Sequence, residues 1–85
     1  MFLVQSVPNE AGEARLGMAV GVRTAGNAVR RNRLRRLIRE SFRMHRQEIP
    51  ALDVLVTART AAAKATNREI FASLARFWHA LGVAK

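Results

Sequence analysis

The order of apolar and polar positions along the chain predicts three strands. Residues 1–7 are mostly apolar, and apolar side chains alternate with small ones over residues 15–22, so both segments are typical of strands. A turn-forming cluster at residues 8–12 lies between them, and we expect the two strands to pair as an antiparallel hairpin. The continuous apolar run at residues 53–58 predicts a third, buried strand.

The same pattern predicts a long helix in the middle of the chain. Residues 24–27 interrupt the second strand, and the side-chain oxygen of Asn27 can accept a hydrogen bond from the exposed amides of a first helical turn. Apolar residues then recur at helical spacing, and Pro50 follows shortly after them. We therefore expect a helix over residues 28–47.

A second helix closes the chain. Thr66 and Glu69 have the spacing of a capping box, in which each side chain accepts a hydrogen bond from the backbone amide of the other. We expect this helix to follow a small-residue loop at residues 60–64, to run to about Leu81 and to stop at Gly82. The predicted order is β-β-α-β-α in a single domain over residues 1–85, an α+β fold with helices packed on a small sheet.

Positive charge is concentrated in the central helix. The chain has 15 basic and 6 acidic residues, a formal net charge of +9 and an isoelectric point of about 11.9. Residues 23–46 contain nine arginines and one acid, Glu40, so this segment carries +8 of the total. Clustered arginine at such a basic isoelectric point is typical of a nucleic-acid-binding protein.

Most of these arginines share one side of the predicted helix. At 100° per residue, a basic arc of about 120° holds Arg31, Arg35, Arg39, Arg43 and Arg46. An apolar arc of about 160°, which we expect to be buried, holds Leu34, Leu37, Ile38, Phe42 and Met44. Asn32 and Arg36 lie at the edge of the basic arc, whereas Arg30 and Arg33 stray from it.

Three other interpretations of the basic arc fit the sequence less well. A merely solvated face normally mixes charges of both signs, whereas here like charges stand four residues apart and repel one another. A membrane-surface helix would give its apolar side to lipid, but this helix needs that side to cover the sheet. A DNA-reading helix needs a helix-turn-helix partner or a dimer interface, and the sequence indicates neither.

The stretch GNAVRRNRLRRLIRESFR, residues 26–43, resembles the signature of the bacterial ribonuclease P protein subunit, whose hallmark is an Arg-Asn-Arg helix. The strands on either side of it, at residues 15–17 and 53–59, are similar to that family as well, and so is the closing helix with Leu74 and Trp78. The resemblance covers essentially the whole chain. It implies the family fold, in which a left-handed crossover through the arginine helix joins two parallel strands, an exception to the usual right-handed rule.

The resemblance also implies a function. In the family, the catalytic RNA subunit carries out endonucleolytic 5′ maturation of tRNA with magnesium bound mainly by the RNA, and the protein binds this RNA and the 5′ leader of precursor tRNA. No protein residue is then expected to be catalytic or to bind a metal. The expected RNA contacts are Arg23, Asn27, Arg30, Arg31, Asn32, Arg33, Arg35, Arg36, Arg39, Arg43 and Arg46. The alternative is a non-enzymatic ribosomal protein, or another protein that binds structured RNA.

The sequence departs from the family pattern at its N-terminus. Family members begin with a helix and a short strand that help to wall the leader cleft, whereas this sequence starts inside the strand that normally follows. Leu3 and Gln5 on that strand are the expected leader-cleft residues. Position 5 often carries an aromatic residue in the family, so glutamine there predicts weaker stacking of a leader base.

Other classes of site are not indicated. The chain has no cysteine, and His45 and His79 stand far apart, so we expect neither a disulfide framework nor a metal site. No apolar run approaches the ~20 residues of a membrane span, and the first residues lack the features of a signal peptide. We therefore expect a cytoplasmic protein without membrane contact, and the sequence indicates no oligomeric state.

Overall fold

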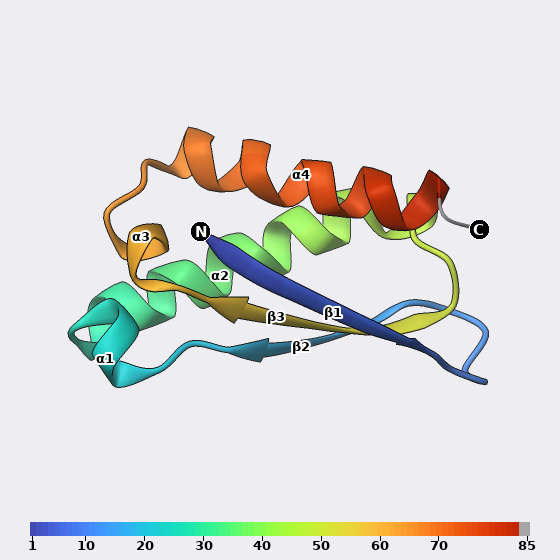
Figure 1. Cartoon of the computed structure of the whole chain (residues 1–85), viewed down its shortest axis with the longest axis horizontal. Helices are drawn as coiled ribbons and strands as arrows, with labels where there is room; N and C mark the ends of the chain where they lie inside the picture. The colour runs from blue at the N-terminus through green and yellow to red at the C-terminus, as the bar shows by residue number, and fades with distance from the viewer. Residues whose placement is uncertain (84–85) are drawn as a thin grey trace.

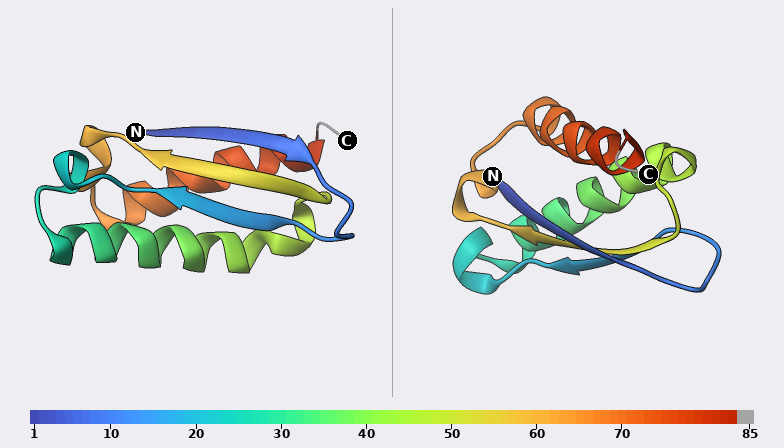
Figure 2. Two further views of the ribbon diagram at one scale, coloured as in Figure 1. Left: turned by 90° about the horizontal axis from the view of Figure 1, so that it is seen from below. Right: turned by 45° about the vertical axis from the view of Figure 1, so that its right-hand side comes forward.

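Three strands form a mixed sheet, and two long helices cover one of its faces (Figure 1, Figure 2). The computed structural model describes residues 1–83, except for the side chains of Val22 and Thr24. The strands are β1 (Phe2–Pro8), β2 (Arg15–Ala19) and β3 (Leu52–Ala58). The long helices are α2 (Ala28–His45) and α4 (Asn67–Val83). Shorter turns of helix are α1 (Val22–Ala25), the 3-10 turn η1 (Arg46–Glu48) and α3 (Thr60–Ala63). The predicted α+β class is confirmed.

The predicted hairpin of the first two strands is wrong, because the sheet has the order β1-β3-β2. β3 lies between the other two strands, antiparallel to β1 and parallel to β2, so Val56 stands opposite both Val4 and Met18. Two physical reasons account for this order. β3 buries three side chains, Val54, Val56 and Ala58, and gains most from the central position. The connection at residues 9–14 is also longer than the two-residue turns that hairpins favour, and it crosses the end of β3 through a hydrogen bond from Asn9 N to Ala51 O.

The crossover from β2 through α2 to β3 is left-handed. In Figure 1 both strands run from right to left, β3 lies above β2, and α2 passes behind the sheet, an arrangement that Figure 2 shows from below. A right-handed crossover would require α2 on the near face. The connection is therefore the rare handedness that the family resemblance implies.

The predicted central helix forms as α2, with its apolar arc against the sheet. Asn27 caps the helix as predicted, since its side-chain oxygen accepts a 2.9 Å hydrogen bond from the amide of Arg30. The buried residues of the arc are Leu34, Leu37, Ile38 and Phe42. Met44, which was expected to be buried with them, is 69% exposed, because it lies at the margin of the arc in the last helical turn. The helix ends at His45, and η1 takes the place of the last two predicted residues.

The two long helices are joined through Trp78. This side chain is fully buried, and its indole nitrogen donates a 2.9 Å hydrogen bond to the hydroxyl oxygen of Ser41. Its ring also meets Phe42 edge to face, with the ring centroids 5.7 Å apart. Ile70 and Leu74 precede Trp78 at intervals of four residues and are buried on the same side of α4. The core thus lies between the sheet, α2 and α4.

The ends of α4 show one confirmed and one wrong prediction. The capping box is present: the amide of Glu69 donates to the hydroxyl of Thr66, and the amide of Thr66 donates to the carboxylate of Glu69. Gly82 does not stop the helix, which continues to Val83. A β-carbon at position 82 would lie 2.6 Å from the carbonyl oxygen of Glu48. Glycine is therefore needed there for the close approach of α4 to η1.

Two predicted irregular segments are short helices in the structure. Residues 22–25, which were expected to end a strand and break it, form α1, and residues 60–63 of the predicted loop form α3. Both are single turns that contact each other at one end of the sheet. Helices this short carry little sequence pattern, because one turn presents no repeated apolar face.

Candidate nucleic-acid interface

The side of α2 that faces away from the sheet is a surface of unpaired arginines. The chain's six Asp and Glu side chains all lie in its described part, and none forms an ion pair with any of the seven α2 arginines. Within residues 1–83, six of the seven also make no side-chain hydrogen bond, whereas Arg33 does. These six, called the α2 basic face below, are Arg31, Arg35, Arg36, Arg39 and Arg43 along the helix and Arg30 in its first turn, which strays from the arc of the others. Arg31 and Arg35 are half-buried and the other four are exposed. Asn32, also exposed, lies among them.

Local structure fixes the direction in which these charges point. The Asn27 cap sets the start of α2, and burial of its apolar arc sets the rotation of the helix about its own axis. Arg31, Arg35, Arg39 and Arg43 are then aligned along one side at intervals of four residues, where like charges repel one another. Their summed charge gives this surface a positive potential, which attracts polyanions.

Arg33 has a different position from the α2 basic face. Its guanidinium donates hydrogen bonds of 2.9 Å to the backbone oxygen of Ala65 and 2.7 Å to the side-chain oxygen of Asn67. It therefore ties α2 to the segment before α4 and to the first residue of α4. The structure gives Arg33 a role inside the chain, and its predicted RNA contact stays a prediction.

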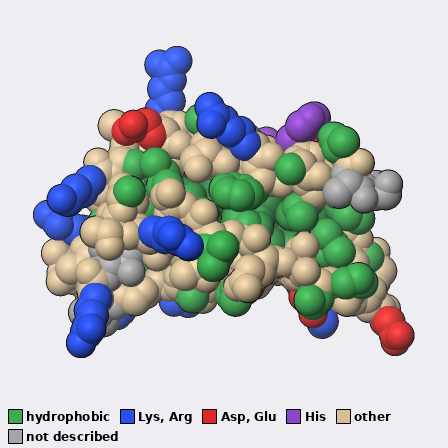
Figure 3. All heavy atoms as spheres, in the orientation of Figure 1, with side chains coloured by type: hydrophobic (Ala, Val, Ile, Leu, Met, Phe, Trp, Pro, Cys, Tyr) green, Lys and Arg blue, Asp and Glu red, His purple; other side chains and the backbone are tan. Residues whose placement is uncertain are grey.

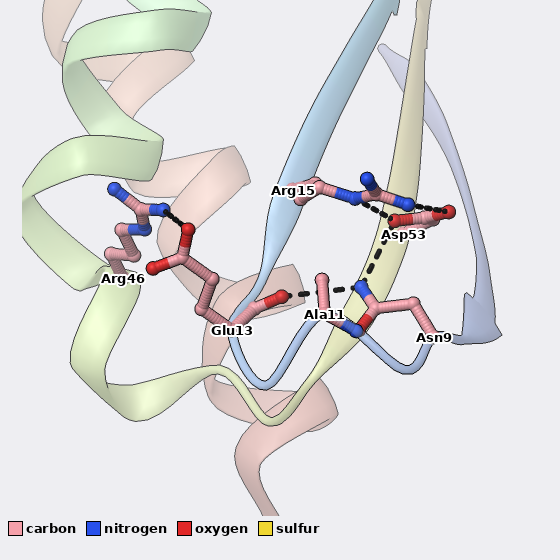
Figure 4. Close-up of polar contacts among 6 residues, drawn as sticks. All are labelled: Asn9, Ala11, Glu13, Arg15, Arg46 and Asp53. Carbon is pink, nitrogen blue, oxygen red and sulfur yellow. Dashed lines mark hydrogen bonds and ion pairs between the residues drawn. The ribbon is translucent and has the colours of Figure 1, made fainter.

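Arg46 and Arg23 also lie apart from the α2 basic face. Arg46 forms a 2.9 Å ion pair with Glu13 in the connection between β1 and β2, as Figure 4 shows. Arg23 is exposed on α1. Asn27 is exposed as well, but its side-chain oxygen is occupied by the cap of α2. The sequence pattern thus grouped residues that the structure places on three different elements.

The sheet face opposite the helices is open and largely apolar. Leu3 and Leu55 are each 40% exposed on it, and Val7 is 58% exposed. A groove of about 620 Å³ runs over this face, where Gln5 and Gly17 flank Leu55 on the neighbouring strands. Figure 3 shows the apolar side chains over the middle and right of this face, with basic side chains at its left end. Gln5 lines the groove, and Leu3 lies farther along the same side of β1.

One end of this groove carries a polar cluster that sequence reasoning missed (Figure 4). The carboxylate of Asp53 accepts hydrogen bonds of 2.8 and 3.1 Å from Arg15 and one of 2.9 Å from Asn9. The hydrogen bond from Arg15, with that from Asn9, holds the pKa of Asp53 below its usual range. The hydrogen bond with Asp53 in turn raises the pKa of Arg15. Arg15 and Asp53 stand opposite each other in the β2–β3 register. Their contact can be predicted only when the parallel pairing of these strands is known.

The histidine and acidic side chains of residues 1–83 are scattered over the fold. No group of three or more His, Cys, Asp or Glu side chains in residues 1–83 lies close enough together to hold a metal ion. His45 instead makes a local contact, its Nδ1 lying 2.9 Å from the backbone oxygen of Ser41. No helix in this part of the chain is long and apolar enough to cross a membrane.

Known proteins with similar sequences are ribonuclease P proteins. The family model described as Ribonuclease P matches residues 1–82. The ribonuclease P protein component of Thioalkalivibrio sulfidiphilus is 47% identical over 70 residues, which cover 82% of this chain and 58% of that protein. The component from Halorhodospira halophila is 42% identical over 82 residues, covering 95% of this chain and 67% of that protein. The chain thus spans about three-fifths to two-thirds of the length of these relatives.

Solved structures give the same result for the fold. The Staphylococcus aureus RNase P protein superposes with a TM-score of 0.84 at 41% identity, covering 99% of this chain and 74% of that one. The Thermotoga maritima RNase P protein superposes with a TM-score of 0.81 at 30% identity, covering 92% of this chain and 74% of that one. The first of these matches spans nearly all of this chain, so it includes the sheet and both long helices. The chain therefore belongs to the ribonuclease P protein family.

Proposed function

We propose that the chain acts as the protein subunit of ribonuclease P and binds the catalytic RNA through the α2 basic face. The observation that carries this proposal is the set of six arginines that form no ion pair with the Asp and Glu side chains of residues 1–83. Guanidinium groups donate in a planar fork that suits phosphate oxygens. Each phosphate contact also releases condensed counterions, so the repulsion within α2 is offset when RNA is bound.

We propose further that the open sheet face binds the 5′ leader of precursor tRNA. A leader is single-stranded, and single strands are held by surfaces that offer apolar contact to bases and positive charge to phosphates. The groove over Leu55 and Gly17 supplies the apolar part, and the basic side chains at the left end of this face in Figure 3 supply the positive charge. Leu3 and Gln5 extend this surface along β1. Because Gln5 offers no aromatic ring, leader bases are held without stacking at that position.

In this scheme the protein positions RNA and neutralises its charge, while the RNA subunit cleaves. Magnesium supplies the Lewis-acid and nucleophile-generating chemistry of phosphodiester cleavage. The carboxylates and histidines in residues 1–83 do not gather into a ligand set, so we assign the ion to the RNA. The α2 arginines lower the repulsion between the catalytic RNA and precursor tRNA, which raises substrate affinity at low magnesium.

Cleavage of a 5′-extended precursor tRNA by a bacterial ribonuclease P RNA tests the proposal. The reaction is measured at low magnesium with and without the 85-residue chain, and we expect the chain to stimulate it. Arg31→Ala, Asn32→Ala and Arg35→Ala should each lower the stimulation without unfolding the protein. Arg76→Ala removes an exposed arginine from α4 instead and is the matched control.

The same assay separates the parts of the proposal. Each arginine-to-alanine change in the α2 basic face should reduce the salt dependence of RNA binding by about one phosphate contact. If the chain binds the RNA in a salt-sensitive way but does not stimulate cleavage, the proposed RNA contact of α2 stands and the proposed leader site is wrong. An absence of both, together with binding to ribosomal RNA, would replace the proposal with the alternative of a ribosomal RNA-binding protein.

A further inference from the structure

A second hollow lies on the opposite side of β2 from the groove, between that strand and the C-terminal half of α2. Its volume is about 500 Å³, which is within the range of small-ligand sites. Its apolar lining comes from Leu16 and Met18 of β2, which are half-buried, and from Phe42 of α2. Arg39 and Arg43 stand on its helical side. The hollow therefore combines an apolar floor with two guanidinium groups.

Of the four arginines that line the hollow, two are already paired with an acidic side chain. Arg15 and Arg46 also line it, but Asp53 pairs with the first and Glu13 with the second. Figure 4 shows the Glu13–Arg46 pair between the β1–β2 connection and η1, and both residues line the hollow. Arg39 and Arg43 pair with none of the six Asp and Glu side chains, all of which lie in residues 1–83. The available charge at the hollow is thus positive and belongs to the α2 basic face.

We propose that this hollow takes an unpaired nucleotide of the partner RNA, with its base over Leu16, Met18 and Phe42 and its flanking phosphates on Arg39 and Arg43. The inference rests on the proposed function, whose RNA would lie along α2. A phosphate alone would use the arginines and leave the apolar floor exposed, whereas a nucleotide uses both. Bases inside a duplex are stacked and cannot enter a hollow, so the nucleotide must come from a loop, bulge or single strand.

Filling the hollow without changing its charge tests this inference in the complex with RNA. Met18→Trp places a large side chain on the floor and keeps every arginine. We expect it to weaken binding to ribonuclease P RNA about tenfold, the loss of one well-held base, and to leave the salt dependence unchanged. Met44→Trp makes the same change at a residue that is 69% exposed and outside the hollow, and should alter affinity by less than about twofold. Equal affinities of the two variants would overturn the inference.

A second measurement keeps the inference testable if Met18→Trp fails to fold. The wild-type chain, labelled at its methionine methyl groups, is titrated with AMP, UMP or ribose 5-phosphate and followed by NMR. We expect AMP or UMP to shift the Met18 methyl resonance saturably and to leave that of Met44 unchanged. Ribose 5-phosphate carries the phosphate without a base, and should leave Met18 unchanged as well. Equal shifts of Met18 with all three compounds, or none with any, would overturn the inference.

The two experiments distinguish this inference from the proposed function. If the wild-type chain binds ribonuclease P RNA and Met18 responds to no nucleotide, the proposed function stands and the hollow is not a nucleotide site. If AMP occupies the hollow but the chain does not bind ribonuclease P RNA, the proposed function falls. The hollow then remains a nucleotide site for a different RNA.

Discussion

Trp78 and Ser41 form a buried hydrogen bond that fastens the two long helices to each other. The indole nitrogen lies 2.9 Å from the hydroxyl oxygen, and neither side chain is exposed. We expect Ser41→Ala to lower the free energy of unfolding by about 1–3 kcal/mol, because the indole N–H is left without an acceptor in the core. Ser73→Ala on α4 has the same gain in helix propensity without this loss and serves as the control. Urea unfolding followed by the fluorescence of Trp78 measures both, and equal midpoints would contradict the prediction.

Gly82 and Glu48 lie too close for any larger residue at position 82. Alanine normally stabilises a helix by about 1 kcal/mol relative to glycine. Here the added β-carbon would lie 2.6 Å from a backbone oxygen, so Gly82→Ala should instead destabilise the protein by about 1–3 kcal/mol. At Gly17 a β-carbon would meet a side-chain carbon of Leu55 at an ordinary 3.5 Å, so Gly17→Ala should be tolerated. Thermal unfolding of the two variants checks the contrast, and a Gly82→Ala protein as stable as wild type would refute the close contact.

Arg33 and Arg36 should respond differently to substitution although both belong to the arginine run. Arg33 is hydrogen-bonded to Ala65 and Asn67, so Arg33→Ala should lower the free energy of unfolding by about 1–2 kcal/mol. Arg36 is exposed, and Arg36→Ala should leave stability within about 0.5 kcal/mol of wild type while weakening RNA binding. Paired denaturation and RNA-binding measurements decide the matter. The prediction fails if Arg36→Ala is the less stable of the two variants.

Asp53 should make stability depend on pH in the acid range. The hydrogen bond from Arg15 lowers its pKa in the folded chain below the ordinary aspartate value of about 3.9. Its contribution to stability is therefore present above about pH 4 and is lost as the pH falls through the lower folded-state pKa. Asp53→Asn lacks this contribution at every pH, so its deficit relative to wild type should shrink from about pH 5 to about pH 2. Urea midpoints across that range measure the deficit, and a constant deficit would contradict the assignment.

A second carboxylate has the same sign of pH dependence and must be separated from Asp53. The backbone amide of Thr66 is the main cause of the lowered pKa of Glu69, and the threonine side chain adds to it. Glu69 titrates in both wild type and Asp53→Asn, so its effect cancels in the difference between them. The comparison therefore isolates the Arg15–Asp53 pair.

The helices were predictable because their signals are local. Asn27, Thr66 and Glu69 act within one helical turn, so their caps could be read directly from the sequence. The apolar arc of α2 has a regular period and gave a nearly correct buried set. Met44 was wrongly predicted to be buried, because the sequence does not show how far the packed elements cover a residue at the edge of the arc.

The sheet order and part of the site depend on distant partners. The sequence places β1 and β2 next to each other, and only the pairing with β3 reveals that they are not neighbours. Arg46 lies in the predicted basic arc and Arg33 strays from it, but the sequence shows the partner of neither until the fold brings Glu13 and Asn67 beside them. The composition of the sequence therefore identified the basic helix. The structure was needed to show which of its arginines make contacts within the chain and which belong to the α2 basic face.

The position of β3 has a consequence for the order in which the chain is made. Both partners of β3 precede it, and the β1 register runs from Phe2 opposite Ala58 to Pro8 opposite Leu52. During synthesis no hydrogen bond of the sheet can form until β3 has left the ribosome. The nascent chain emerges with two unpaired strands and with α2 lacking the sheet that buries its apolar side. Folding is therefore late and depends on contacts distant in sequence, and a polypeptide that terminates before residue 52 has no sheet.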